Sequence, residues 1–210
     1  DIAKLAGEDF HLGVTCPYPR QPRDFLDCIF IDGHIYSRVD NSFTRVENII
    51  MTIVTLKALK LLLPAGKRLM GIDHSRKAWG LAIATPDFSI AMPLATIFRS
   101  KFNDDVQKLS ILCKEYGVGG FVIGLPLNMD GSEGSRTDSV RHFALNLLQA
   151  KEVLGFEPLI TLWDERLSTH SVDDFLNEYA HISRDRRNEI IDKLAAQLIL
   201  QEALNALVKI

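Results

Sequence analysis

The sequence has little of several features that would by themselves assign a protein class. It holds three cysteines in 210 residues, an odd number without a Cys-x-x-Cys spacing, which argues against a disulfide framework or a zinc ribbon. The most apolar run, at residues 49–63, is interrupted by Lys57 and Lys60 and is too short to span a bilayer. No signal-peptide pattern stands at the start. We therefore expect a protein of a reducing compartment with no membrane partner.

The sequence also lacks an excess of either charge. Its 24 basic and 27 acidic residues give a net charge of −3, so no overall positive field attracts a polyanion. Any contact with nucleic acid must therefore come from a local group of basic residues. The contents of 47% hydrophobic and 24% charged residues are close to the average for globular proteins and exclude a wholly disordered chain.

Residues 1–50 differ in pattern from the rest of the chain. Three prolines between positions 17 and 22 break any helix there. Residues 27–40 are compatible with a β-hairpin that turns at Asp32-Gly33, and no chemical motif is present. Met51 is the first methionine and stands just before the ordered pattern. We predict an N-terminal extension at 1–50 and a working domain at 51–210; a genuine N-terminal subdomain is the alternative.

From Met51 onward, apolar segments alternate between strand and helix patterns. Strands are predicted at 68–73, 78–84, 90–97, 119–124 and 159–163, and helices at 55–62, 104–116, 135–150, after Ser168 or Thr169, and from Ser183 to about Leu207. The first three strands have short links and should form an antiparallel meander, whereas the later ones alternate with helices and should add in parallel. The predicted fold class is α/β, with a mixed five-stranded sheet and helices on both faces. This is the architecture of the ribonuclease H-like fold.

Three acidic residues stand where this fold would gather them. Asp73 ends the first of these strands, Glu165 follows the last strand, and Asp192 shares the small apolar face of the final helix with Ala196. Parallel sheets collect their working groups at the carboxyl ends of strands, so Asp73 and Glu165 should approach each other if their strands are neighbours.

Converging carboxylates repel one another unless divalent cations lie between them. Hard oxygen ligands with open positions suit Mg²⁺ or Mn²⁺, and such a site can hydrolyse a phosphodiester with an activated water. Taken singly, each acid has a simpler explanation. An Asp at a strand end is usually a turn or helix cap, and Asp192 could pair with a buried arginine.

A second segment, at residues 124–134, is a loop with glycines between a strand and a helix. Backbone N–H groups at the start of that helix can receive a phosphate, although an ordinary crossover loop has the same composition. Basic residues lie in short groups near the acids and at the start of the last helix, where a solvated helix start is the simpler explanation. The candidate nucleic-acid contacts are Lys77, Asn128, Ser132, Arg136, Arg141, Arg166 and Arg187.

Four segments carry a resemblance to a known family: Gly71–Asp73, Gly124–Gly134, Trp163–Thr169 and Ile191–Gln201. In order and spacing they resemble the YqgF family, bacterial Holliday-junction-resolvase-like proteins that are also described as pre-16S rRNA nucleases. The resemblance covers about residues 51–207. It implies a ribonuclease H-like fold and a cytoplasmic, metal-dependent nuclease that processes the 5′ end of precursor 16S rRNA.

The resemblance also implies residue roles, with Asp73, Glu165 and Asp192 as the catalytic and metal-binding triad for Mg²⁺ or Mn²⁺. Two positions depart from the usual family pattern, Ser75 where glycine is common and Ser135 where proline is common. The glycine position raises the question of whether the turn after Asp73 keeps its geometry.

Other functions stay open at the level of sequence. One is a Holliday-junction-type DNA endonuclease, since RNA and DNA would be distinguished by 2′-hydroxyl contacts or junction shape. Another is a non-catalytic RNA-binding factor in ribosome assembly. An actin-like kinase or ATPase also begins with a strand ending in Gly-Ile-Asp, but it needs two such domains. The expected partner is precursor 16S rRNA or a structured DNA, and the chain could be a monomer or a homodimer.

Overall fold

The computed structural model describes residues 53–127, 130–164 and 184–209, with the backbone alone at 184–189, and the backbone of four strands nearer the N-terminus. These strands are β1 (Leu12–Val14), β2 (Leu26–Ile31), β3 (His34–Val39) and β4 (Ser42–Arg45). They form an antiparallel sheet in chain order. The pairing of Ile31 with His34 confirms the predicted hairpin, whereas β1 and β4 were not predicted.

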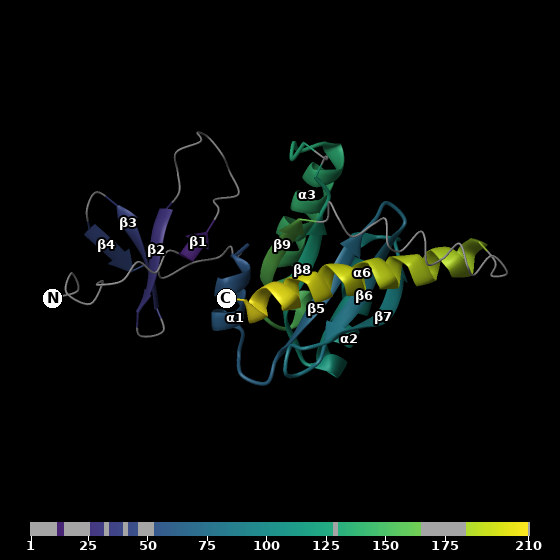
Figure 1. Cartoon of the computed structure of the whole chain (residues 1–210), viewed down its shortest axis with the longest axis horizontal. Helices are drawn as coiled ribbons and strands as arrows, with labels where there is room; N and C mark the ends of the chain where they lie inside the picture. Colours follow the sequence, from purple (N-terminus) through teal and green to yellow (C-terminus); the bar gives the residue numbers. More distant parts are fainter. Residues whose placement is uncertain are drawn as a thin grey trace.

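A second sheet has five strands and contains the segments with the acidic residues (Figure 1). Its strands are β5 (Arg68–His74), β6 (Ala78–Ala84), β7 (Ala91–Phe98), β8 (Val118–Leu125) and β9 (Leu159–Asp164). The order is β7-β6-β5-β8-β9, with β5, β6 and β7 antiparallel and β8 and β9 added in parallel. This mixed sheet confirms the predicted ribonuclease H-like architecture.

Five described helices flank the strands, and two of their ends carry residues that suit helix termini. They are α1 (Leu56–Leu62), α2 (Phe102–Tyr116), α3 (Ser135–Gln149), α4 (Lys151–Leu154) and α6 (Arg184–Val208). The Thr55 hydroxyl accepts a hydrogen bond from the Ala58 N–H and so caps α1. Gly117 ends α2 in the left-handed conformation that glycine adopts without strain. The short α4 was not predicted, and none of the described helices is long and apolar enough to cross a membrane.

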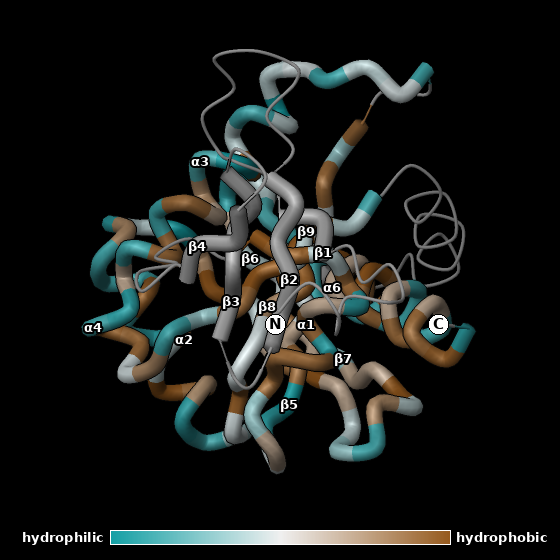
Figure 2. Tube along the Cα trace, turned by 90° about the vertical axis from the view of Figure 1, so that its left-hand side faces the viewer, coloured by the Kyte–Doolittle hydropathy of each residue, from teal (hydrophilic) through white to brown (hydrophobic). Residues whose placement is uncertain are grey.

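The helices cover both faces of the five-stranded sheet and enclose two apolar cores. On one face, α2 and α3 pack on β-strand residues such as Ile72, Trp79 and Phe121. On the other, α1 and α6 pack on Leu69, Ala82 and others. Figure 2 shows hydrophobic residues gathered along the strands and hydrophilic segments on the outer helices, for example at α2 and α4. The sheet is thus buried on both sides, as its nearly continuous apolar strands require.

Small residues on the sheet let α6 lie unusually close to it. A Cβ atom at Gly71 would stand 2.7 Å from the Ala196 carbonyl oxygen, so only glycine fits there without a shift. Two glutamines then tie the helix to the first residue of β7. The Gln197 side chain donates to the Ala91 carbonyl (3.0 Å), and the Ala91 N–H donates to the Gln201 side chain (2.8 Å). These contacts fix the position of α6 along the sheet.

Candidate metal and nucleic-acid site

Asp73 lies on the central strand β5, one residue before its end. It pairs with Gly80 of the antiparallel strand β6. Opposed residues of an antiparallel pair point to the same face of the sheet, with Cα atoms about 5 Å apart. A side chain at Gly80 would point at α6, and Gly71, two residues before Asp73, also faces this helix. Asp73 therefore stands on the face that α6 covers.

Asp192 lies on α6, directly above the sheet residues Asp73 and Gly80. Its Cα atom would be 3.0 Å from a Cβ placed on Gly80, which is the register partner of Asp73. The spacing along the two elements agrees. Gly71 to Asp73 advances about 6.6 Å along a strand, and Ala196 back to Asp192 advances about 6 Å along a helix. The structure thus brings Asp73 and Asp192, 119 positions apart in the sequence, to neighbouring places.

The Asp192 carboxyl group is half-buried, and this burial raises its pKa above the ordinary value. Its neighbours one and two turns on, Ala196 and Ile199, are fully buried, as the small apolar face predicted. Within the described residues no cation forms a salt bridge with Asp192, so the alternative of an ion pair with a buried arginine gains no support there. A carboxylate in this position is destabilised unless a cation approaches it.

The condition under which Asp73 and Glu165 were expected to approach each other is not met, because β5 and β9 are not neighbouring strands. Strand β8 lies between β5 and β9, so the ends of β5 and β9 are about two strand spacings, roughly 10 Å, apart. The reason is that β6 and β8 already occupy the two sides of β5, so β9 pairs with β8 on its outer side. Glu165 itself lies outside the described residues.

The last residues of β9 show on which face of the sheet the Asp164 side chain lies. Trp163 lies on the α6 side, where its indole N–H donates to the Glu202 carboxylate at 3.3 Å. Asp164 is the next residue, and because side chains alternate along a strand it points to the opposite face, where it is exposed. Asp164 thus faces away from Asp73 and Asp192.

Two carboxylates on one face form a donor set that fits a hard divalent cation. Among the described residues there is no group of three or more His, Cys, Asp or Glu side chains able to hold a metal. Mg²⁺, however, is commonly bound through one or two carboxylates, with water and substrate phosphates completing its shell. Asp73 and Asp192 match this kind of donor set, and the described residues offer a soft metal such as zinc no group of thiolates or imidazoles.

A tight turn follows Asp73 and joins β5 to β6. The Ser75 hydroxyl donates to the Ala78 carbonyl (2.9 Å) and accepts from the Ala78 N–H (3.0 Å). Among the described non-glycine residues only Phe88 has a positive φ, so position 75 does not need glycine. The departure from the family pattern at Ser75 therefore leaves the turn intact. Lys77 is exposed at the tip of this turn, beside the carboxyl end of β5.

Two residues near this turn have a role that the sequence did not reveal. The guanidinium of Arg99 donates to the carbonyls of Ser75 (3.2 Å) and Arg76 (3.4 Å), so it braces the turn. His74 is the last residue of β5, one residue beyond the predicted strand at 68–73, and its ring stacks on Phe143 with the ring centroids 4.4 Å apart. Burial, and then the charge of Arg99, lower the pKa of His74 to about 4. The sequence around His74 does not indicate its burial, because the ring packs on Phe143, a helix residue far away in the chain.

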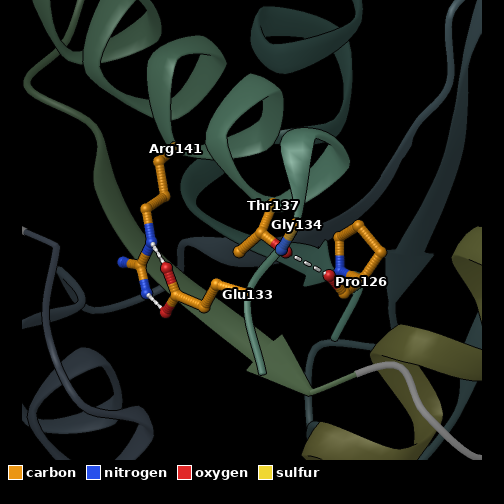
Figure 3. A network of polar contacts seen from close by, with 5 residues as sticks. All are labelled: Pro126, Glu133, Gly134, Thr137 and Arg141. Carbon is orange, nitrogen blue, oxygen red and sulfur yellow. Dashed lines mark hydrogen bonds and ion pairs between the residues drawn. The ribbon is translucent and has the colours of Figure 1, made fainter. Parts of the chain in front are cut away.

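The glycine-containing loop ends in a fixed arrangement at the start of α3 (Figure 3). The Thr137 hydroxyl donates to the Pro126 carbonyl and accepts from the Gly134 N–H, which joins the two ends of the loop. Ser135, at the usual proline position, is the first residue of the helix. Arg136 follows it and is exposed beside the N-terminus of α3.

The other candidate nucleic-acid contacts differ in how available they are. Arg141 makes a two-pronged ion pair with Glu133 (Figure 3), so a phosphate would have to share or displace this partner. The Ser132 hydroxyl donates to Asp130 at 2.6 Å. Asn128 and Arg166 lie outside the described residues, and only the backbone of Arg187, in the first turn of α6, is described.

The described parts of these segments share one edge of the sheet. The carboxyl ends of β5, β8 and β9, the hairpin tip and the start of α3 lie together there, as the parallel pairing of these strands dictates. The model of one protein family, RuvX, with the description Holliday junction resolvase, matches residues 67–206, about two thirds of the chain. The chain belongs to the RuvX family. This confirms the resemblance, because RuvX and YqgF denote one family.

Relatives of this RuvX chain include proteins with the name "Putative pre-16S rRNA nuclease". The one from Rhodospirillum centenum is 47% identical over 157 residues, which cover 75% of this chain and 83% of the relative. The one from Rhodospirillum rubrum is 43% identical over 75% of this chain and 94% of the relative. Among solved structures, T. thermophilus RuvC in complex with a Holliday junction substrate aligns with a TM-score of 0.41 at 14% identity, over 68% of this chain and 96% of that one.

Proposed function

We propose that this chain is a metal-dependent nuclease of the bacterial cytoplasm that processes the 5′ end of precursor 16S rRNA. One observation carries the proposal. Asp192 of α6 lies over Gly80, the strand partner of Asp73, at the edge of the sheet where the parallel strands end. Two acidic residues whose backbones meet this closely, one of them with its pKa raised by burial, support a place for a divalent cation. The relatives' name supports the choice of substrate.

Asp73 and Asp192 would hold Mg²⁺ or Mn²⁺, and Glu165 is the proposed third ligand. Glu165 lies outside the described residues, and its role is proposed from the family resemblance. Asp164, the residue before it, points away from the α6 side, since side chains alternate along a strand and Trp163 faces α6. When bound there, divalent cations supply Lewis acidity that lowers the pKa of a water and stabilises charge on the phosphodiester.

The chain's own residues would hold the nucleic acid across this edge. Lys77 and Arg136 are exposed and free to move onto phosphates, whereas Arg141 would exchange Glu133 for a phosphate. The remaining proposed contacts are Asn128, Ser132, Arg166 and Arg187. Because the net charge is −3, this local group must supply the attraction, and cleavage should weaken steeply with salt.

Single substitutions of the three proposed ligands, with the neighbouring Asp164 as a control, test the proposal. Asp73→Asn, Asp192→Asn and Glu165→Gln should each lower Mn²⁺-dependent cleavage of a precursor 16S rRNA leader at least about 100-fold, since each removes a charge that binds the metal. Asp164→Asn is the matched control, and it should retain most of the activity because Asp164 faces away. Undiminished cleavage by Asp73→Asn and Asp192→Asn would refute the site.

A DNA junction nuclease is the second candidate, and the description of the matched family favours it. Competition between an rRNA leader and a four-way DNA junction, in the same Mn²⁺ buffer, separates the two. Faster cleavage of the junction would assign the enzyme to DNA. Binding of RNA without cleavage of either substrate, in the presence of Mg²⁺ or Mn²⁺, would instead indicate a non-catalytic assembly factor.

A further inference from the structure

We propose that Gly80 is a positioning residue for catalysis, because its missing side chain sets the separation between Asp73 and Asp192. The inference rests on the proposed function, since it concerns the distance between two proposed metal ligands. Gly80 has no side chain with which to bind a metal or a substrate. It lies beneath the backbone of Asp192 and directly opposite Asp73 in the sheet, and thus links the two.

The backbone of Asp192 lies so close to Gly80 that no residue with a Cβ atom fits there without a shift. A Cβ there would lie 1.8 Å from the Asp192 carbonyl oxygen and 2.3 Å from its carbonyl carbon. Real Cβ atoms essentially never come within 3.0 Å of another heavy atom. The Asp192 backbone would therefore have to move away by about 1.2 Å, the difference between 3.0 and 1.8 Å. Backbone atoms of a helix cannot rotate aside as a side chain can.

The rest of α6 cannot absorb this shift by sliding along the sheet. One turn further on, the Ala196 carbonyl already touches the position of Gly71, and Gln197 and Gln201 hold the helix to Ala91. The displacement would therefore concentrate at the turn that carries Asp192. Asp73 would stay in place because it lies in the central strand between β6 and β8.

A displacement of this size matters for a metal site. Mg²⁺ requires near-ideal octahedral geometry with ligands at about 2.0–2.1 Å, so two carboxylates that separate by about 1 Å no longer share one coordination shell well. Misplacement of a catalytic group by about 1 Å can reduce turnover roughly 100-fold. A role in folding alone would lower stability without changing the metal affinity of the folded protein.

The test compares Gly80→Ala with Gly71→Ala in the full chain. Both glycines face α6, one helical turn apart, but a Cβ at Gly71 needs a shift of only about 0.3 Å, since its contacts are at 2.7 Å. Mn²⁺ affinity is measured by the electron paramagnetic resonance signal of free Mn²⁺, and folding by thermal melting without metal. We expect Gly80→Ala to bind Mn²⁺ at least about tenfold more weakly than wild type. Gly71→Ala should bind it within about twofold of wild type.

A longer side chain at position 192 gives a second readout. Asp192→Glu should weaken Mn²⁺ binding at least about tenfold in the wild-type background, where the gap suits Asp, but should partly restore it in Gly80→Ala, where the backbone has moved outward. Equal Mn²⁺ affinity of wild type and Gly80→Ala would overturn the inference alone. If Gly80→Ala does not fold, the inference is judged by Asp192→Glu alone, and unchanged affinity overturns it. Failure of the wild-type chain to bind Mn²⁺ would overturn the proposed function together with this inference.

Discussion

At the scale of single residues, the site holds side chains in environments that stability alone would not select. Asp192 is a half-buried carboxylate above the small-residue face of the sheet, and its burial raises its pKa. Ser75 shows the opposite case, because its hydroxyl bonds within the turn and replaces a common glycine without strain. The buried carboxylate of Asp192 lowers the stability of the fold, whereas the hydroxyl of Ser75 stabilises the turn. This difference agrees with the proposed functional role of Asp192 and a structural role of Ser75.

Asp192→Asn should therefore affect stability and function in opposite directions. A raised folded pKa means that the charged form is disfavoured, so stability falls as pH rises through the ordinary carboxyl range and stays lower at neutral pH. The neutral amide removes this cost. Because Asp192 is only half-buried and water screens its charge, we expect the metal-free variant to be slightly more stable than wild type in urea unfolding at pH 7, while losing Mn²⁺ binding. Loss of stability would show that Asp192 is a structural residue.

At the scale of elements, most boundaries follow from local signals. Thr55 and Gly117 mark the start of α1 and the end of α2, and both helices lie within two residues of their predicted ranges. The junction between β7 and α2 depends on an acid that the sequence did not single out. Asp105 is buried and accepts from the Ser100 N–H (2.7 Å), the Ser100 hydroxyl (2.8 Å) and Lys108 (3.2 Å).

Asp105→Asn should weaken this junction in a pH-dependent way. Burial opposes the charged form, but the hydrogen bonds from Ser100 and Lys108 outweigh it and lower the pKa of Asp105. A lowered folded pKa stabilises the protein above the ordinary value of 3.8, and this contribution disappears as pH falls through the folded value. We expect a loss of about 1–3 kcal/mol at pH 7 and a smaller loss at pH 3, by urea unfolding. The exposed neighbour Asp104→Asn is the control, with a change within about 0.5 kcal/mol. An equal loss at both pH values would contradict this account.

At the scale of the whole molecule, the described strands form two separate sheets, β1–β4 and β5–β9. The family match at residues 67–206 lies within the predicted working domain, whose boundary at Met51 stays a prediction. The structure shows why the boundary cannot lie much later. Val54 donates its N–H to Ile160 and accepts from the Thr161 hydroxyl, and α1 buries Leu59 against α6.

Two truncated chains test this organisation. A chain of residues 51–210 should fold cooperatively and keep the Mn²⁺ affinity of the full chain, because it retains both cores of the five-stranded sheet. A chain of residues 64–210 lacks Val54, Leu56 and Leu59, each worth roughly 1.5–3 kcal/mol of burial, and should melt far earlier or not fold. Circular dichroism melting measures both. An insoluble 51–210 chain would favour a genuine N-terminal subdomain.

The sequence by itself determined the kinds and order of the elements around the site and placed Asp73 at the end of a strand and Asp192 on an apolar helix face. These features depend on local periodicity and on capping, which act within a few residues. Only the tertiary structure decided that β8 separates β5 from β9, that His74 stacks on Phe143, and that the backbone of Asp192 rests on Gly80. Such contacts join residues far apart in the chain, and they depend on which faces pack together with the fewest voids, which no local pattern encodes.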